Sequence, residues 1–266
     1  KIENLYVNFF LIFSFLILAT IDDIKNLRPI IKILFCSLLS GIAIFYDSTL
    51  TLNTLNFYYF GLFIFTDNLL IIYVFPILCI LLLVNAFNFT DGVNCLAGSI
   101  GLSFLIYVCV KNHEILSSVY LIITSILIFL YLNYSKSIFL GDSGNYLISS
   151  MVAIIILKEN FYNPESYYAE EIFLLFLIPG IDMFRLFISR IAKKQNPFKG
   201  DNDHLHYLLF NQFGYNKTIL LYLCLVNFPI YIFYFFNNIL IFVIFFTFLI
   251  YTYLIYTSYL NKNKAA

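Results

Sequence analysis

Two adjacent aspartates, Asp22 and Asp23, follow an apolar run near the start of the chain and precede Arg28 and Pro29. Adjacent carboxylates repel each other, so the pair suits a proton acceptor or a site where a cation keeps both groups ionised. Lys32, one turn into the next apolar run, could contact a phosphate or extend to the membrane surface. A simple charge cluster at the end of a helix is the alternative interpretation of the pair.

A second polar segment, residues 85–94, ends a later apolar run with the sequence NAFNFTDGVN. It contains three asparagines, Asn85, Asn88 and Asn94, and one aspartate, Asp91. Polar groups at the edge of a membrane are unfavourable unless they find partners, so this density favours a site for a polar ligand over a plain turn.

A third segment, residues 139–145 with the sequence FLGDSGN, opens another apolar run. Gly141 and Gly144 allow the backbone to approach a ligand closely. Asp142 lies near the expected start of a helix, where an anion or a coordinated cation is well placed. The segment therefore predicts a tight ligand-binding loop, with an ordinary turn between helices as the alternative.

The longest polar segment, residues 189–216, contains Arg190 and the run Asp203-His204-Leu205-His206. Arginine makes bidentate contacts to phosphate, and histidines can donate hydrogen bonds. We interpret this segment as a lid over phosphate groups. A basic loop that contacts anionic lipid explains the lysines of the segment equally well, but it does not explain the two histidines.

The elements that position these residues must be membrane-spanning helices. Hydrophobic residues make up 62% of the chain and the mean hydropathy is +0.89, beyond what a soluble core can bury. Runs of the length that spans a bilayer recur, whereas the alternating segments of a transmembrane barrel are absent from the sequence. We predict one all-α membrane domain over residues 1–266, with about nine spans near 5–21, 29–46, 69–86, 96–111, 115–133, 141–157, 169–188, 217–236 and 238–260.

Alternating the sides of these spans places four loops, near 22–32, 85–98, 134–145 and 189–216, on one membrane face. That face carries most of the basic residues, which are Lys25, Arg28, Lys32, Lys136, Arg190, Lys193, Lys194, Lys199, Lys217, Lys262 and Lys264. Positive charge marks the cytoplasmic side, so we expect a multi-pass protein of the inner (plasma) membrane with a cytoplasmic site. The glutamates fall on the opposite face.

In their order along the chain, these motifs resemble those of the polyprenyl-phosphate N-acetylhexosamine-1-phosphate transferases, a glycosyltransferase family 4 type. The matching residues are Asp22-Asp23, Asn85-Ala86-Phe87-Asn88 with Asp91-Gly92, residues 139–144, and the series Asp182, Arg190, Pro197-Phe198 and Asp203–His206. The family fold has ten or eleven helices, usually two of them before the paired aspartates. Only one precedes the pair here, so we expect that N-terminal helices are missing. Asn145 stands where serine is usual.

The resemblance implies magnesium-dependent transfer of N-acetylhexosamine 1-phosphate from a UDP-sugar to undecaprenyl phosphate, with release of UMP, as the first step of a lipid-linked envelope glycan such as lipopolysaccharide. It implies that Asp142 and Asn88 bind Mg²⁺, with Mn²⁺ as an alternative ion. The implied roles of the remaining residues are binding or deprotonation of the lipid phosphate by Asp22 and Asp23, donor orientation by Asp91, substrate binding by Lys32, Asn85 and Asn94, and stabilisation of phosphate charge by Arg190, His204 and His206.

Two other classes remain open at this point. An intramembrane aspartyl protease could use Asp142 with Asp182 or with the Asp22-Asp23 pair, but that leaves Asn88, Asp91 and the histidines unexplained. A non-enzymatic transporter would need ionisable residues at mid-membrane depth or broken helices. The hexosamine and the pathway stay open; membrane lipids and a second copy in a homodimer are expected partners, and nucleic acid is not.

Overall fold

The structure is a computed structural model that describes residues 3–197 and 202–265. Nearly all of this part of the chain is helical. The helices are α1 (Glu3–Lys25), α2 (Pro29–Tyr46), α3 (Phe75–Asn88), α4 (Leu96–Lys111), α5 (Leu116–Tyr134), α6 (Gly141–Tyr162), α7 (Ala169–Ala192), α8 (Leu205–Phe213), α9 (Tyr215–Phe235) and α10 (Leu240–Ala265). The predicted all-α membrane bundle is confirmed, since each predicted span overlaps one long helix and the short α8 is added.

Six of these segments are long and apolar enough to cross a membrane. They are Leu5–Lys25, Pro29–Tyr46, Leu70–Asn88, Ala169–Ala192, Tyr215–Phe235 and Asn237–Asn261, and two shorter apolar helices are Leu96–Lys111 and Val119–Tyr134. Helix α6 is in neither group because polar residues occupy both of its ends. It packs against α1, α3 and α4, so it is surrounded by protein.

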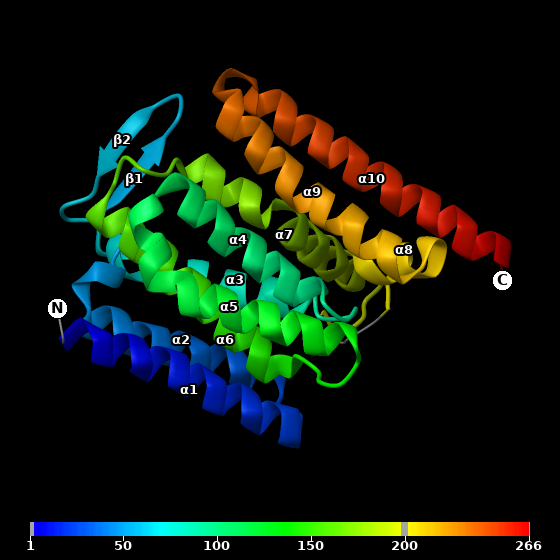
Figure 1. Cartoon of the computed structure of the whole chain (residues 1–266), viewed down its shortest axis with the longest axis horizontal. Helices are drawn as coiled ribbons and strands as arrows, with labels where there is room; N and C mark the ends of the chain where they lie inside the picture. The colour runs from blue at the N-terminus through cyan, green and yellow to red at the C-terminus, as the bar shows by residue number, and fades with distance from the viewer. Residues whose placement is uncertain (1–2, 198–201, 266) are drawn as a thin grey trace.

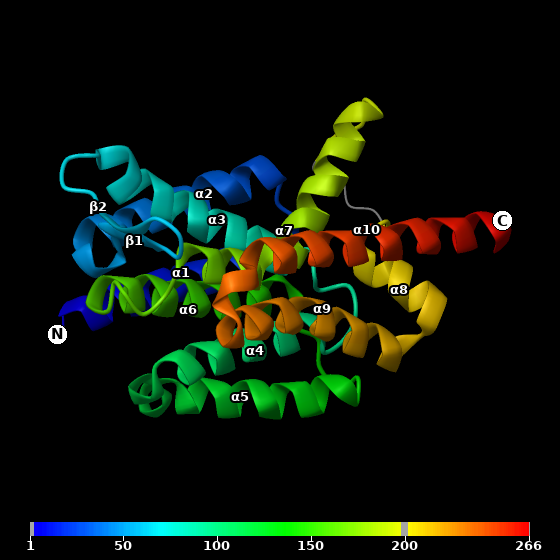
Figure 2. The same ribbon diagram turned by 90° about the horizontal axis from the view of Figure 1, so that it is seen from above.

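The helices run along the long axis of the molecule, with α1 and α2 on one side and α9 and α10 on the other (Figure 1). Their core is aromatic as well as aliphatic: the buried rings of Phe87 in α3 and Phe104 in α4 are 5.6 Å apart. Figure 2 shows the C-terminal half of α7 leaving the bundle. Pro179 lies inside this helix, before Asp182, Arg185 and Arg190.

An antiparallel β-hairpin connects α2 to the helical segment that begins at Leu70, and the sequence did not predict it. Its strands are β1 (Thr54–Phe57) and β2 (Gly61–Ile64). A one-turn π-helix (Leu70–Val74) then leads into α3, so the predicted helix at 69–86 is α-helical only from Phe75 onwards. The hairpin and the start of α1 lie at one end of the bundle, and α8 and the C-terminus at the other (Figure 1).

Charged residues at the hairpin end are paired with one another. Lys111 of α4 lies 2.9 Å from Glu171 of α7, which also accepts a hydrogen bond of 2.7 Å from the hydroxyl of Tyr107. Lys158 of α6 pairs with the buried Asp47 at 3.1 Å. A buried carboxylate is tolerated when a cation or donor compensates it, so these residues join the ends of neighbouring helices.

Close packing of α4 on α6 predicts a specific loss of stability. A Cβ atom at Gly101 would lie 2.4 Å from Cγ2 of Ile148, whereas one at Gly180 in α7 would meet nothing within 4 Å. Alanine has a higher helix propensity than glycine at both positions, so the difference in stability between the two variants measures the effect of the clash. We expect Gly101→Ala to lower the free energy of unfolding by about 1–3 kcal/mol relative to Gly180→Ala. Equal melting temperatures of the two purified variants would contradict this packing.

Candidate active site

Lys32 lies between two aspartates that come from different parts of the chain. The tight turn after α1 places Lys32 of α2 beside Asp22, and the two side chains form an ion pair. The ammonium group is also 3.1 Å from Oδ2 of Asp142, at the start of α6. Asp22 is buried, and its Oδ1 accepts a hydrogen bond of 2.7 Å from the backbone N–H of Leu27. Lys32 of α2 therefore joins its own helix to α1 and α6.

Asp23 caps the start of α6 from a neighbouring helix. Its carboxylate accepts hydrogen bonds from the backbone N–H groups of Asp142 at 3.0 Å and Ser143 at 3.2 Å, and from the Ser143 hydroxyl. The first N–H groups of a helix have no partner within it, so this carboxylate satisfies them. Gly141 has a φ of 64°, which favours glycine, and a Cβ there would approach Oδ2 of Asp23 to 3.2 Å. Asp23 thus holds Asp142 in place.

Asp91, in the turn between α3 and α4, faces the start of α6. Its Oδ2 accepts a hydrogen bond of 2.9 Å from the amide of Asn145, which is fully buried and also donates to the carbonyl of Gly141. Burial raises the pKa of Asp91 to about 7, and the negative charges of Asp142 and Asp23 contribute to this rise. The carboxylate of Asp91 therefore lies close enough to those of Asp142 and Asp23 to be repelled by both.

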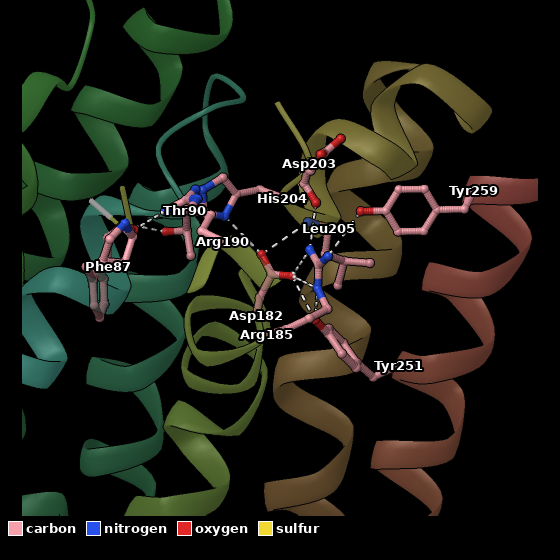
Figure 3. Close-up of polar contacts among 11 residues, drawn as sticks. Phe87, Thr90, Asp182, Arg185, Arg190, Asp203, His204, Leu205, Tyr251 and Tyr259 are labelled. Carbon is pink, nitrogen blue, oxygen red and sulfur yellow. Dashed lines mark hydrogen bonds and ion pairs between the residues drawn. The ribbon is translucent and has the colours of Figure 1, made fainter. Parts of the chain in front are cut away.

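Asp182 of α7 is the centre of a second network (Figure 3). Its Oδ1 accepts from the guanidinium of Arg185 at 2.8 Å and from the hydroxyl of Tyr251 at 2.8 Å. Its Oδ2 lies 3.1 Å from Nδ1 of His204 and accepts from the N–H of Leu205 at 3.1 Å. The carboxylate thereby fixes the start of α8 against α7. These partners are cations and donors, unlike the second aspartate that a protease would require.

The two histidines form a stack on the turn that carries Asp91. The ring of His204 is 5.2 Å from that of Phe89 and 5.4 Å from that of His206. A Cβ atom at Gly92 would lie 2.0 Å from Nε2 of His206, so a residue with a side chain cannot fit there without a shift. The Asp91-Gly92 and His-Leu-His motifs, far apart in sequence, are therefore in direct contact.

His206 is buried with neither ring nitrogen bonded to any other residue that the structure describes. Burial lowers the pKa of its imidazole to about 3, and the neighbouring His204 adds to this effect while Asp182 opposes it. The side chain is therefore neutral near pH 7, with one donor and one acceptor available.

Other predicted site residues are placed less directly. Arg190 is buried and donates from Nη1 to the carbonyl of Pro197 at 2.8 Å, so it supports the lid segment. The amide of Asn85 donates to Leu81 within its own helix at 2.7 Å, and the backbone carbonyl of Asn94 accepts from the Tyr215 hydroxyl at 3.2 Å. Asn88 is half-buried. Phe198, Lys199, Gly200 and Asp201 of the predicted lid lie outside the described residues, as do the side chains of Lys262 and Lys264.

Asn133, which the sequence analysis did not single out, joins two of the motif loops. This residue near the end of α5 is buried; its Oδ1 accepts from the N–H of Cys95 at 2.5 Å and its Nδ2 donates to the carbonyl of Ile138 at 2.7 Å. One loop leads from Asp91 to α4 and the other leads to Asp142. The sequence could have indicated this contact, because Asn133 is an isolated polar residue near the end of an apolar helix and a buried amide needs hydrogen-bond partners.

The donor atoms present are compatible with magnesium. Within residues 3–197 and 202–265 no three His, Cys, Asp or Glu side chains are arranged to hold a metal ion by themselves. Magnesium, however, is usually bound by one or two carboxylates together with substrate phosphates and water. Burial is the main cause of the raised pKa of Asp91, and the smaller part contributed by the negative charges of Asp142 and Asp23 is what a divalent cation would relieve.

The contacts of Asn133 predict coupled effects on both loops. Asn133→Ala leaves a part-buried N–H and a part-buried carbonyl without their partner, which should lower the free energy of unfolding by about 1–3 kcal/mol. Hydrogen exchange should rise in residues 91–95 and 136–140 together. Asn227→Ala is the matched control, because its amide donates to Leu223 within its own helix, α9. Unchanged exchange in both loops of the Asn133 variant would show that the amide does not join them.

Comparison with known proteins identifies the family of the chain. The sequence model of glycosyl transferase family 4 matches residues 5–160. An undecaprenyl-phosphate alpha-N-acetylglucosaminyl 1-phosphate transferase of Thermotoga maritima is 27% identical over 217 residues, covering 80% of this chain and 65% of that protein. A decaprenyl-phosphate N-acetylglucosaminephosphotransferase of Mycobacterium leprae is 29% identical over 171 residues, covering 53% and 42%. The chain thus spans less than two thirds of the length of these relatives. It belongs to glycosyl transferase family 4, as a multi-pass member of that family.

Proposed function

We propose that the chain carries the catalytic site of a transferase that moves N-acetylhexosamine 1-phosphate from a UDP-sugar to undecaprenyl phosphate and releases UMP. Membership of glycosyl transferase family 4 supports this proposal, as do the names of the relatives from Thermotoga maritima and Mycobacterium leprae. The observation that carries it is the convergence of Lys32 with Asp22 and Asp142 at the end of three helices. We expect the phosphate group of the lipid to contact the protein at these helix ends.

In the proposed reaction, an oxygen of the lipid phosphate attacks the phosphorus that bears the sugar. The bond from that phosphorus to the bridging oxygen breaks, and UMP leaves with the electron pair. Both reactants are anions, so their approach requires positive charge and hydrogen-bond donors. We assign contact with the lipid phosphate to Lys32, whose ammonium is fixed by Asp22 and Asp142. Direct attack is preferred to a covalent aspartyl-phosphate intermediate, because Asp23 already accepts hydrogen bonds from the start of α6.

Asp142 with Asn88 would hold Mg²⁺, or Mn²⁺, which when bound would offset the charge of the donor diphosphate. Asp91 would orient the donor and Asn94 would meet the nucleotide. Donation to phosphate oxygens is proposed for His204 and His206, and the free nitrogens of His206 favour this role. Arg190 would add positive charge from its buried position. Substrate binding is also proposed for Asn85, whose side-chain N–H donates to a carbonyl within α3.

The membrane orientation and the oligomeric state are parts of the same proposal. The basic residues of the loops favour a site on the cytoplasmic side of the inner (plasma) membrane, where a UDP-sugar would be available. A homodimer stays a prediction from the family resemblance.

The transferase proposal predicts UMP release. Full-length protein in lipid nanodiscs, supplied with undecaprenyl phosphate, Mg²⁺ and a panel of UDP-N-acetylhexosamines, should release UMP with at least one of the sugars. Asp142→Asn should lower turnover by about 10²-fold or more, the scale for loss of a group that acts on developing charge. Asp67→Asn is the control, since Asp67 is exposed near the hairpin.

Two outcomes of this experiment are distinct. If folded wild-type protein releases no UMP with any of the sugars, the transferase proposal is overturned. The alternative interpretation as a non-enzymatic transporter would then be favoured. Wild-type turnover in Asp142→Asn would overturn only the assignment of Asp142 to the metal.

A further inference from the structure

The β-hairpin is held firmly against the bundle at the end away from the candidate site (Figure 1). The amide of Asn160 in α6 donates to the carbonyl of Thr54 at 3.0 Å, and the N–H of Tyr58 donates to Glu170 of α7 at 3.2 Å. The ring of Tyr58 packs 5.8 Å from that of Phe233 in α9. Strand β1 therefore has a defined position relative to three helices.

The second strand and the turn before it are apolar and exposed. Phe60 is 77% exposed, Ile64 is 67% exposed and Phe63 is 45% exposed. Successive side chains of a strand point to opposite faces, so both faces of β2 present apolar groups. A water-exposed strand normally alternates polar and apolar residues, and β2 does not.

Strand β2 also has a free edge. It pairs with β1 alone, and none of the other described residues supplies hydrogen bonds to its outer edge. In the hydrocarbon region of a membrane each unpaired backbone group would be strongly unfavourable, whereas in bulk water the apolar side chains would be. The headgroup region of the membrane avoids both problems. It hydrates the unpaired backbone edge, and it accommodates aromatic and aliphatic side chains.

Exposed apolar residues also flank the hairpin in the chain. Phe45 and Tyr46 at the end of α2 are 78% and 73% exposed, and Leu69 and Leu70 after the hairpin are 66% and 70% exposed. Tyr46 ends one segment that is long and apolar enough to span the membrane, and Leu70 begins the next. The hairpin thus lies between two spanning segments in the chain, which favours lipid over a protein partner as the cover of β2.

We propose that β2 and the turn at residues 58–60 form an interfacial anchor that lies among the lipid headgroups on the side of the membrane opposite the candidate site. The anchor sets the depth at which α2 and α3 lie in the bilayer. This inference does not depend on the transferase activity.

The sequence contains no tryptophan, so a single introduced tryptophan reports on its own surroundings. Phe60→Trp is suitable because the side chain is largely exposed, and Ile64→Trp provides a second position should the first variant fold poorly. Each variant of the 266-residue chain is reconstituted in phosphatidylcholine vesicles that contain lipids brominated either near the headgroup or near the chain ends. We expect shortened emission wavelength and stronger quenching by the shallow bromines than by the deep ones.

Two control variants calibrate the depth. Phe245→Trp, at an exposed position within α10, should be quenched more strongly by the deep bromines. His113→Trp, at an exposed position between α4 and α5, should emit at the wavelength of hydrated tryptophan.

Three results would overturn the anchor. Hydrated emission without quenching at positions 60 and 64 would place the hairpin in water. Stronger quenching by deep bromines would place it in hydrocarbon. Short-wavelength emission without lipid quenching would mean that protein, for example the edge strand of a second copy, covers β2.

Discussion

The ion pair of Lys32 with Asp22, extended to Asp142, is the contact on which the candidate site depends. A buried carboxylate at a membrane boundary is unfavourable unless a cation compensates it, and Asp22 is almost fully buried. Lys32 provides that compensation from the first turn of α2. Because the same ammonium reaches Asp142, one charge ties the first two helices to α6.

From this contact the site extends across the end of the bundle by short steps. Asp23 fixes the start of α6, and Asn145 of α6 holds Asp91. The turn with Asp91 continues to Gly92, which packs on His206, and His204 beside it is fixed by Asp182. Motifs more than a hundred residues apart in sequence thus lie against one another. Carboxylates gather at the start of α6, and the histidines and arginines gather on α7 and α8.

Much of this arrangement could be predicted from the sequence. Long apolar runs specify spanning helices because the bilayer admits few other structures, and helix parity then sorts the loops to two sides. Individual side-chain contacts could not be predicted in this way. The sequence does not distinguish Asp23 from Asp22. In the structure, Asp23 caps the start of α6, whereas Asp22 pairs with Lys32. The hairpin was missed because its strands are only four residues each; β1 alternates polar and apolar residues but β2 does not, and no Asn-Gly or Asp-Gly pair marks the turn between them.

A double-mutant cycle between Lys32 and Asp22 tests the central claim most directly. The free energy of unfolding of full-length protein in detergent is measured for Lys32→Met, Asp22→Asn and the double variant. If Lys32 compensates the buried carboxylate, Lys32→Met should be destabilised by about 3–5 kcal/mol, because it leaves Asp22 buried without its cation. The double variant should then be markedly more stable than the sum of the two single effects predicts. Single effects that add to within about 0.5 kcal/mol would show that the two residues do not interact, and would contradict the account.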